Sequence, residues 1–230
     1  MTAPKERPIL FSGPMVRALL DGRKTQTRRV VKKAPHEEHD WSAVIVRGEA
    51  CFVQRANVGT PNETCHFMYG QEGDRPSIRC PYGAPGDRLW VKETWGLNDT
   101  IYGGDQPIPK ARPEDLPTEG LVFFATESDT EIRNELRWRP SIHMPRWASR
   151  LTLEITEVRA ERLHDISEAD AMAEGAAPCA NGVWFDSKPE FAGADARGAY
   201  YCLWEHINGA GSWAANPWVW AVSFNLLKGD

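Results

Sequence analysis

The stretch RLTLEITEVRAERL, residues 150–163, has the clearest strand pattern of the chain. Its first half alternates apolar and polar residues as far as Ile155, which is typical of a strand with one buried face. The apolar residues then change phase by one position at Val158 and Ala160. Since successive side chains point to opposite faces of a strand, this phase change predicts a β-bulge or corner near Thr156.

Shorter strands and three short helices flank this strand along the chain. Alternating or β-branched runs predict strands in ILFS (9–12), TQTRRVV (25–31), DRLWVKETW (87–95), LVFFAT (121–126) and WVWAVSFNLL (218–227), and a hairpin in AVIVRGEACFVQ (43–54). Apolar residues at helical spacing, followed by a glycine, predict helices at 12–21, 167–174 and 199–208. Many short strands with few helices favour an α+β or mainly β fold, in which helices pack against a small barrel. A doubly wound parallel sheet is disfavoured, because strands and long helices do not alternate regularly.

The composition is that of a globular chain with an acidic net charge. Of 230 residues, 41% are hydrophobic and 26% are charged, and the formal net charge is −5 at pH 7. This length favours a single domain over 1–230, with loop-like insertions at about 34–85 and 96–120. Binding along a long polyanion needs many simultaneous Lys and Arg contacts, so the charge leaves room only for local contact with RNA. The best local source is the basic segment 17–33, in which Asp21 is the only acid.

Neither a membrane partner nor a bound metal is expected. The N-terminus lacks the apolar stretch of a signal peptide, and no run of about 18 apolar residues occurs, which predicts a cytoplasmic protein. Five scattered cysteines without a CxxC pair favour reduced thiols over a disulfide framework. Cys65, His66 and Cys80 match no strong zinc pattern and have no evident fourth ligand.

The segment DGRKTQTRR, residues 21–29, combines bases and hydroxyls at the end of the first predicted helix. Cations are favoured at a helix C-terminus, so a solvated basic turn is one interpretation. If the chain then enters a strand, Thr25, Thr27 and Arg29 share one face of it. A hydroxyl beside an amine is the minimum that an activated nucleophile requires, so a catalytic loop containing Lys24 is the alternative.

A carboxylate, Glu174, occupies the last turn of the helix predicted to begin after Ser167. There it lies against the negative end of the helix dipole, a position that suits acid–base work when the group is also partly buried. A solvent-facing glutamate is the simpler interpretation.

Two aromatic segments offer further candidates. RWRPSIHMPRWASR, residues 137–150, interleaves basic residues with tryptophans, an arrangement that can stack on a base and hold a phosphate. Tryptophans that pack around a structural His143 are the competing interpretation. Trp213 lies in a glycine-containing segment that forms either the lip of a pocket or a tight connection between helix and strand.

Four stretches at both ends and through most of the core carry a family resemblance. They are LLDGRKTQTRRV (19–30), PYGAPGDRLWVKETW (81–95), WRPSIHMPRWASRLTLEITEVRAERLHDISEADAMAEG (138–175) and INGAGSWAANPWVWAVSF (207–224). They resemble the ASCH-domain proteins of the PUA-like superfamily, in the larger form often encoded by phages and prophages. The resemblance implies a compact β-barrel with flanking helices, the fold that the strand pattern also favours.

The resemblance also implies an activity and a set of site residues. Some small ASCH proteins hydrolyse the amide of N4-acetylcytidine, with a lysine and a threonine in a G-x-K-x-x-T-x-R motif and a glutamate from a later helix. GRKTQTRR supplies Lys24 and Thr27 at this spacing with Arg29 in register, and Glu174 occupies the matching helical position. The implied mechanism has Thr27 attack the acyl carbonyl, Lys24 accept the hydroxyl proton or steady the oxyanion, and Glu174 protonate the leaving amine or activate a water.

We expect a small nucleoside or nucleobase substrate, with no metal or cofactor. Attack by a water that Glu174 activates, with Thr27 only orienting the substrate, is a second form of the same mechanism. The other functions that the resemblance allows are a non-catalytic binder of RNA or modified nucleobases and a ribonuclease. Arg23 and Arg28 are expected to tune the charge of the site. Contacts to the substrate are expected from Arg29, Thr25, His143, Trp95 and Trp213.

Overall fold

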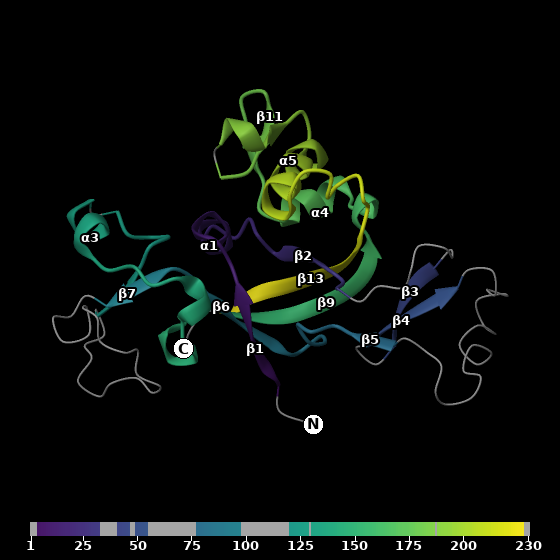
Figure 1. Ribbon diagram of the computed structural model, residues 1–230, viewed down its shortest axis with the longest axis horizontal. Helices are drawn as coiled ribbons and strands as arrows, with labels where there is room; N and C mark the ends of the chain where they lie inside the picture. Colours follow the sequence, from purple (N-terminus) through teal and green to yellow (C-terminus); the bar gives the residue numbers. More distant parts are fainter. Residues whose placement is uncertain are drawn as a thin grey trace.

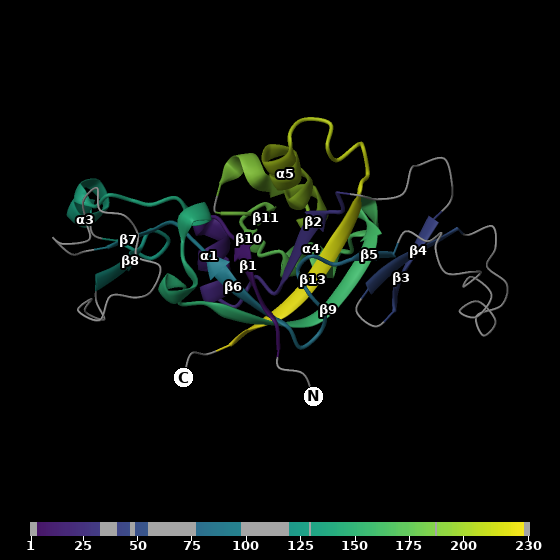
Figure 2. The same ribbon diagram turned by 60° about the horizontal axis from the view of Figure 1, so that its bottom comes forward.

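A five-stranded sheet organises the chain (Figure 1). The computed structural model describes residues 4–32, 41–46, 49–54, 77–97, 120–128, 130–186 and 188–227. In order across the sheet, the strands are β1 (Glu6–Leu10), β6 (Arg88–Lys92), β9 (Thr152–Arg162), β13 (Trp218–Leu227) and β2 (Gln26–Val30). The two longest strands, β9 and β13, lie side by side and curve together across the molecule (Figure 2).

The predicted bulge in β9 is present. The register between β9 and β13 shifts between Ser223 and Phe224, which pair with Glu157 and Ile155. Thr156 is therefore the extra residue, and its side chain is exposed. The bulge allows the apolar residues on both sides of it to face the core although their spacing in the sequence is irregular.

The sheet is open, and no sheet in the described part of the chain closes into a barrel. β1 runs parallel to β6, whereas the other three strand pairs are antiparallel. The edge strands β1 and β2 are connected by helix α1 (Gly13–Leu20). A side chain also joins them, because Arg29 Nη2 donates to the Leu10 carbonyl at 2.8 Å. The expected barrel is thus replaced by a curved sheet, while the mixed class with short helices is confirmed.

Helices α4 (Glu168–Ala173) and α5 (Ala196–Asn208) lie together over one end of the sheet (Figure 1). A small antiparallel sheet of β10 (Ala177–Cys179), β11 (Gly182–Trp184) and β12 (Ala192–Gly193) packs beside α5. The predicted capping residue of α4 is confirmed, since Ser167 and Asp170 bond to each other's backbone N–H groups. Short 3-10 turns complete the described helical segments: η3 (Ser141–His143), η4 (Arg146–Ala148), η5 (Leu163–Asp165) and η6 (Pro189–Phe191).

Two smaller units extend from opposite sides of the five-stranded sheet (Figures 1 and 2). One is the antiparallel sheet of β3 (Trp41–Val46), β4 (Glu49–Gln54) and β5 (Ser77–Arg79), whose first two strands confirm the predicted hairpin. The other contains β7 (Trp95–Leu97), β8 (Leu121–Phe123) and α3 (Thr130–Glu135). Most of the remaining residues of the predicted insertions, 34–85 and 96–120, lie outside the described residues.

Strand β13 is buried on both faces, because an apolar cluster covers each of them. Trp220, Val222 and Phe224 belong to a cluster with β1, α1, β6 and β9. Val219 faces a second cluster, formed with α4 and α5. In the described ranges, no helix is both long and apolar enough to cross a membrane.

Candidate active site

Two segments far apart in the sequence meet beside α4. Lys24, just before β2, and Glu174, just after α4, form an isolated antiparallel β-bridge. The neighbouring Thr25 N–H donates to the Ala173 carbonyl at 2.8 Å. This bridge fixes the backbone on both sides and brings the lysine and the glutamate to the same place.

Gly175 makes this close approach possible. Its φ is +110°, a backbone conformation that favours glycine. A Cβ atom at this position would lie 3.0 Å from the Ala18 Cβ and 3.2 Å from the Lys24 Cβ. A side chain there would therefore push the end of α4 away from α1 and Lys24.

Lys24 and Glu174 form a buried ion pair. The Lys24 Nζ donates to Glu174 Oε2 at 2.8 Å, and the two side chains are only 1% and 5% exposed. Nζ also donates to the backbone carbonyls of Gln26 and Glu174, both at 2.9 Å. An ammonium has three N–H groups and can donate to all three oxygens, whereas a neutral amine has only two.

Burial lowers the pKa of Lys24 below its ordinary value, and the Glu174 carboxylate opposes this effect. The pair is nevertheless arranged to keep the positive charge, since all three N–H donors have an oxygen partner. The expected role of Lys24 as acceptor of the hydroxyl proton is thus disfavoured, because its nitrogen has no lone pair available in this arrangement.

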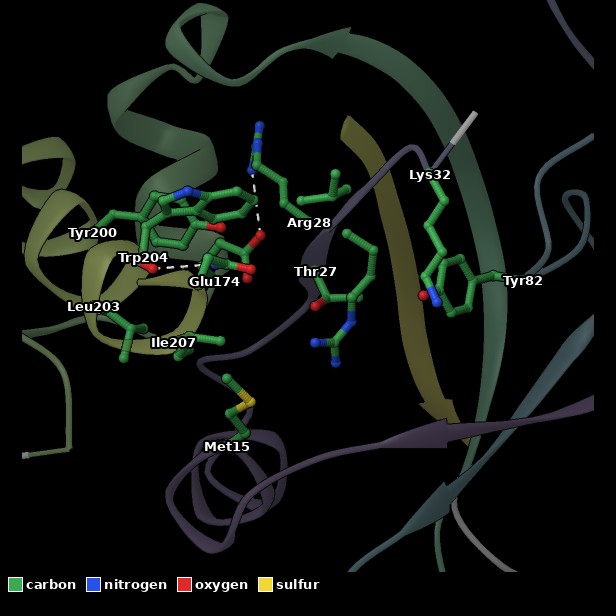
Figure 3. Close-up of a pocket in the computed structure, with 13 residues that line it drawn as sticks. Met15, Thr27, Arg28, Lys32, Tyr82, Glu174, Tyr200, Leu203, Trp204 and Ile207 are labelled. Atoms are coloured by element: carbon green, nitrogen blue, oxygen red, sulfur yellow. Dashed lines mark hydrogen bonds and ion pairs between the residues drawn. The ribbon is translucent and has the colours of Figure 1, made fainter. Parts of the chain in front are cut away.

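Arg28 holds the other oxygen of Glu174. Its side chain is fully buried, and Nη1 lies 3.5 Å from Glu174 Oε1 (Figure 3). Nη2 contacts Glu161 Oε1 at 2.7 Å and Asp170 Oδ2 at 3.3 Å. Lys24 and Arg28 therefore flank the Glu174 carboxylate on its two oxygens and restrict its rotation.

Asp170 anchors this network to the start of α4. Burial by itself would raise the pKa of Asp170, but hydrogen bonds from Arg159, Ser167 and Gln26 outweigh burial and hold the pKa far below its usual value of 3.8. A carboxyl group whose pKa is depressed by folding stabilises the native state only while it is ionised. Its contribution is therefore present above the unfolded pKa and is lost as the pH falls through the lower, native pKa.

Asp170→Asn is accordingly expected to destabilise the protein at pH 7 by about 1–2 kcal/mol. This is the free energy of hydrogen bonds to a charged group, reduced because the carboxylate is partly exposed to solvent. The difference in unfolding free energy between wild type and variant should stay constant from pH 7 down to about 4, and it should shrink as the pH falls further, toward about 2. Urea unfolding followed by circular dichroism over this range measures it. A difference that is constant with pH would show that the ionised carboxylate is not its source.

A pocket of about 220 Å³ opens above the Glu174 carboxylate. In Figure 3, Thr27 lies between Glu174 on one side and the pair Lys32 and Tyr82 on the other. Thr27 is itself buried, and its hydroxyl makes no hydrogen bond to the described residues. The pocket is lined by Met15, Thr27, Arg28, Arg29, Val30, Lys32, Tyr82, Glu174, Tyr200, Leu203, Trp204, Ile207 and Asn208.

Three aromatic residues of the pocket are not among the expected site residues. Tyr200 and Trp204, one turn apart on α5, form a wall beside Glu174, and Tyr82 comes from the loop before β6 (Figure 3). Burial raises the pKa of both tyrosines, and the Glu174 charge raises that of Tyr200 further. The only available signal in the sequence is that a buried helix face carries a phenol and an indole, both of which need polar partners.

Of the expected site residues, the structure brings Lys24, Thr27, Glu174 and Arg29 together. Arg29 lines the pocket, but Thr25 is exposed and does not. Trp213 does not line the pocket. Its ring packs against Tyr200, which does, at a centroid distance of 6.3 Å.

Trp95 and His143 lie away from the pocket. Trp95 is fully buried in β7 and packs edge-on against Trp147 at 5.9 Å, within the unit that extends away from α5 (Figures 1 and 2). His143 is exposed on η3. Trp147 packs with Trp95 and Met144 in a small core, and Trp138 packs edge-on against Phe124. The packing interpretation is therefore confirmed for the tryptophans but not for His143.

No group of three or more His, Cys, Asp or Glu residues suited to a metal occurs within the described ranges. Cys80 is a free, buried thiol, and burial raises its pKa. Cys65 and His66 lie outside the described residues.

Comparison with protein-family models, with curated proteins and with solved structures yields no match for this chain.

Proposed function

We propose that this protein is a PUA-like, ASCH-type amidohydrolase that removes an acyl group from the exocyclic N4 of a modified cytosine, as in N4-acetylcytidine. One observation carries the proposal. A carboxylate held by two buried cations, Glu174, lines the same pocket as Thr27, whose hydroxyl has no hydrogen bond to the described residues. A base and a nucleophile in one small pocket are the two groups that acyl transfer requires.

In the proposed mechanism, Glu174 accepts the proton of the Thr27 hydroxyl while Thr27 Oγ attacks the acyl carbonyl carbon. Glu174 then gives this proton to N4, the C–N bond breaks, and cytidine leaves. The acyl group remains on Thr27 as an ester. A water molecule, deprotonated by the same carboxylate, attacks the ester and releases acetate, which restores the hydroxyl.

Lys24 acts through Glu174 in this mechanism. It does not line the pocket, and its three donors are occupied. We assign it the role of a positioning residue, which fixes the orientation of the carboxylate.

The pocket also has surface suited to a pyrimidine ring. Trp204, Tyr200 and Tyr82 all line it. These three residues offer aromatic surface to a cytosine ring.

The size and charge of the protein support a small substrate. A pocket of about 220 Å³ lies below the range of roughly 300–1,000 Å³ for drug-sized ligands. The net charge of −5 opposes binding along a polyanion. These two features favour hydrolysis of a small nucleoside derivative over ribonuclease activity or binding of long RNA.

Thr27→Val tests the nucleophile. This nearly isosteric change removes only the hydroxyl, and we expect it to lower kcat on N4-acetylcytidine by about 10²–10⁴-fold, whereas Thr27→Ser should retain much of the activity. Chromatography of free cytidine measures both. Wild-type turnover in Thr27→Val would assign the attack to a water molecule. If wild-type protein releases no cytidine from any N4-acyl cytosine yet binds RNA in a salt-dependent way, the protein is a binder and the proposal fails.

A further inference from the structure

The pocket has a basic end that the proposed chemistry does not use. Lys32 and Tyr82 both line the pocket, and in the view of Figure 3 both are drawn on the far side of Thr27 from Glu174. Arg29 lines the same pocket, and its positive charge acts to lower the pKa values of Tyr82, Lys24 and Tyr200. The charge of Arg29 therefore acts on both the acidic and the basic end of the pocket.

These two cations, Arg29 and Lys32, lack acidic partners within the described ranges. Arg29 donates to the Leu10 carbonyl and lies over the Phe11 ring, but it contacts no described carboxylate. Lys32 is exposed and makes no ion pair with a described residue. By contrast, Lys24 and Arg28 are each paired with Glu174. Two cations that have no acidic partner among the described residues, and that line one pocket, offer a site for an anionic group.

The spacing of this site suits one small molecule with an acyl amide at one end and an anion at the other. Residues 27 and 29 are two positions apart on β2, which corresponds to about 7 Å of strand and places both side chains on the same face. Arg29 presents a planar guanidinium, which recognises phosphate by paired hydrogen bonds. The phenol of Tyr82 is protonated at neutral pH and can donate a third.

We propose that the natural ligand is a nucleoside 5′-monophosphate and not the free nucleoside, with its phosphate bound by Arg29, Lys32 and Tyr82. The proposal rests on the proposed function for the orientation of the ligand, with the acyl amide at Glu174. The phosphate site itself rests on the cations alone. The phosphate group belongs to a free monophosphate and not to a phosphodiester within a nucleic-acid strand, because the pocket is small and the net charge of the protein is negative.

The experiment compares N4-acetylcytidine with its 5′-monophosphate. In wild type, kcat/KM should be about tenfold higher for the monophosphate, the effect of one charge-assisted hydrogen bond. In Lys32→Ala the ratio of the two values should fall toward one, and in Lys32→Arg it should be restored. Lys188→Gln is the matched control: Lys188 is exposed, pairs with Asp186 and lies outside the pocket, so the ratio should stay at the wild-type value. Equal kcat/KM for both substrates in wild type would overturn the phosphate site and leave the proposed hydrolase intact.

A binding measurement separates the two proposals. Calorimetric titration of cytidine and of cytidine 5′-monophosphate requires no turnover. If no acyl compound is hydrolysed but the monophosphate still binds about tenfold more tightly, and Lys32→Ala reduces this difference, the phosphate site stands without the hydrolase. Tighter binding of a single-stranded oligonucleotide than of the monophosphate would overturn the assignment to a small ligand.

Discussion

Glu174→Gln is expected to lower kcat on N4-acetylcytidine by about 10³-fold, within the range for loss of a general base. The change removes the proton acceptor but keeps a side-chain oxygen that can accept the hydrogen bond from Lys24. Because it also leaves the buried Lys24 ammonium without its counter-charge, a loss of stability is expected beside the loss of rate. Steady-state kinetics, together with a thermal unfolding curve, measure both properties.

Glu161→Gln is the control for this experiment. Glu161 contacts Arg28 at 2.7 Å but does not line the pocket. Its substitution alters the same ion-pair network without touching the proposed reacting groups, so kcat should stay within a few-fold of wild type. Equal losses in the two variants would show that the charge network as a whole, and not the Glu174 carboxylate, sets the rate.

Lys24→Met is expected to destabilise the protein by about 3–5 kcal/mol, the cost of leaving a buried charge without its partner. Glu174 is 5% exposed, and the longer contact with Arg28, at 3.5 Å, would be its one remaining ion pair among the described residues. Urea unfolding at pH 7 measures the loss. Because the methionine fills nearly the same volume, a cavity should contribute little.

The double variant Lys24→Met/Glu174→Gln completes the cycle. It removes both charges, so it should be more stable than the sum of the two single losses implies. Strict additivity of the two single losses would mean that the ion pair contributes no coupling energy, and would contradict the role of Lys24 as the partner that holds Glu174.

Local sequence patterns predict the framework of this fold because strands and helices follow the spacing of apolar residues. The bulge at Thr156 is the clearest case, since a change of phase within one strand leaves few alternatives. The prediction of a closed barrel is wrong. Whether two edge strands pair depends on their relative placement in space, and here the Arg29 side chain contacts Leu10 without a backbone ladder.

The site is predictable only in part. Family resemblance groups Lys24, Thr27 and Glu174, although spacing alone cannot show that two residues 150 positions apart in the sequence form an ion pair. The apolar spacing of α5 predicts that Tyr200 and Trp204 are buried, and both are. Whether such a helix face borders the core or a pocket depends on what packs opposite, which the spacing does not show.

Trp95 and His143 are residues that were expected in the site but do not line the pocket. The composition around them suggests binding to a base, but Trp95 is 0% exposed in a separate small core. Basic and aromatic residues near one another also form cation–π contacts within a fold, as Arg150 does with Phe123 at 4.0 Å. Composition alone does not distinguish the two uses.

The most direct measurement is the release of cytidine and acetate from N4-acetylcytidine by purified wild-type protein, with Glu174→Gln and Lys188→Gln assayed in parallel. We expect time-dependent release of both products in equal amounts by wild type and Lys188→Gln, and a rate about 10³-fold lower with Glu174→Gln. Absence of product with wild type, or the same rate with Glu174→Gln, would contradict the proposed amidohydrolase mechanism.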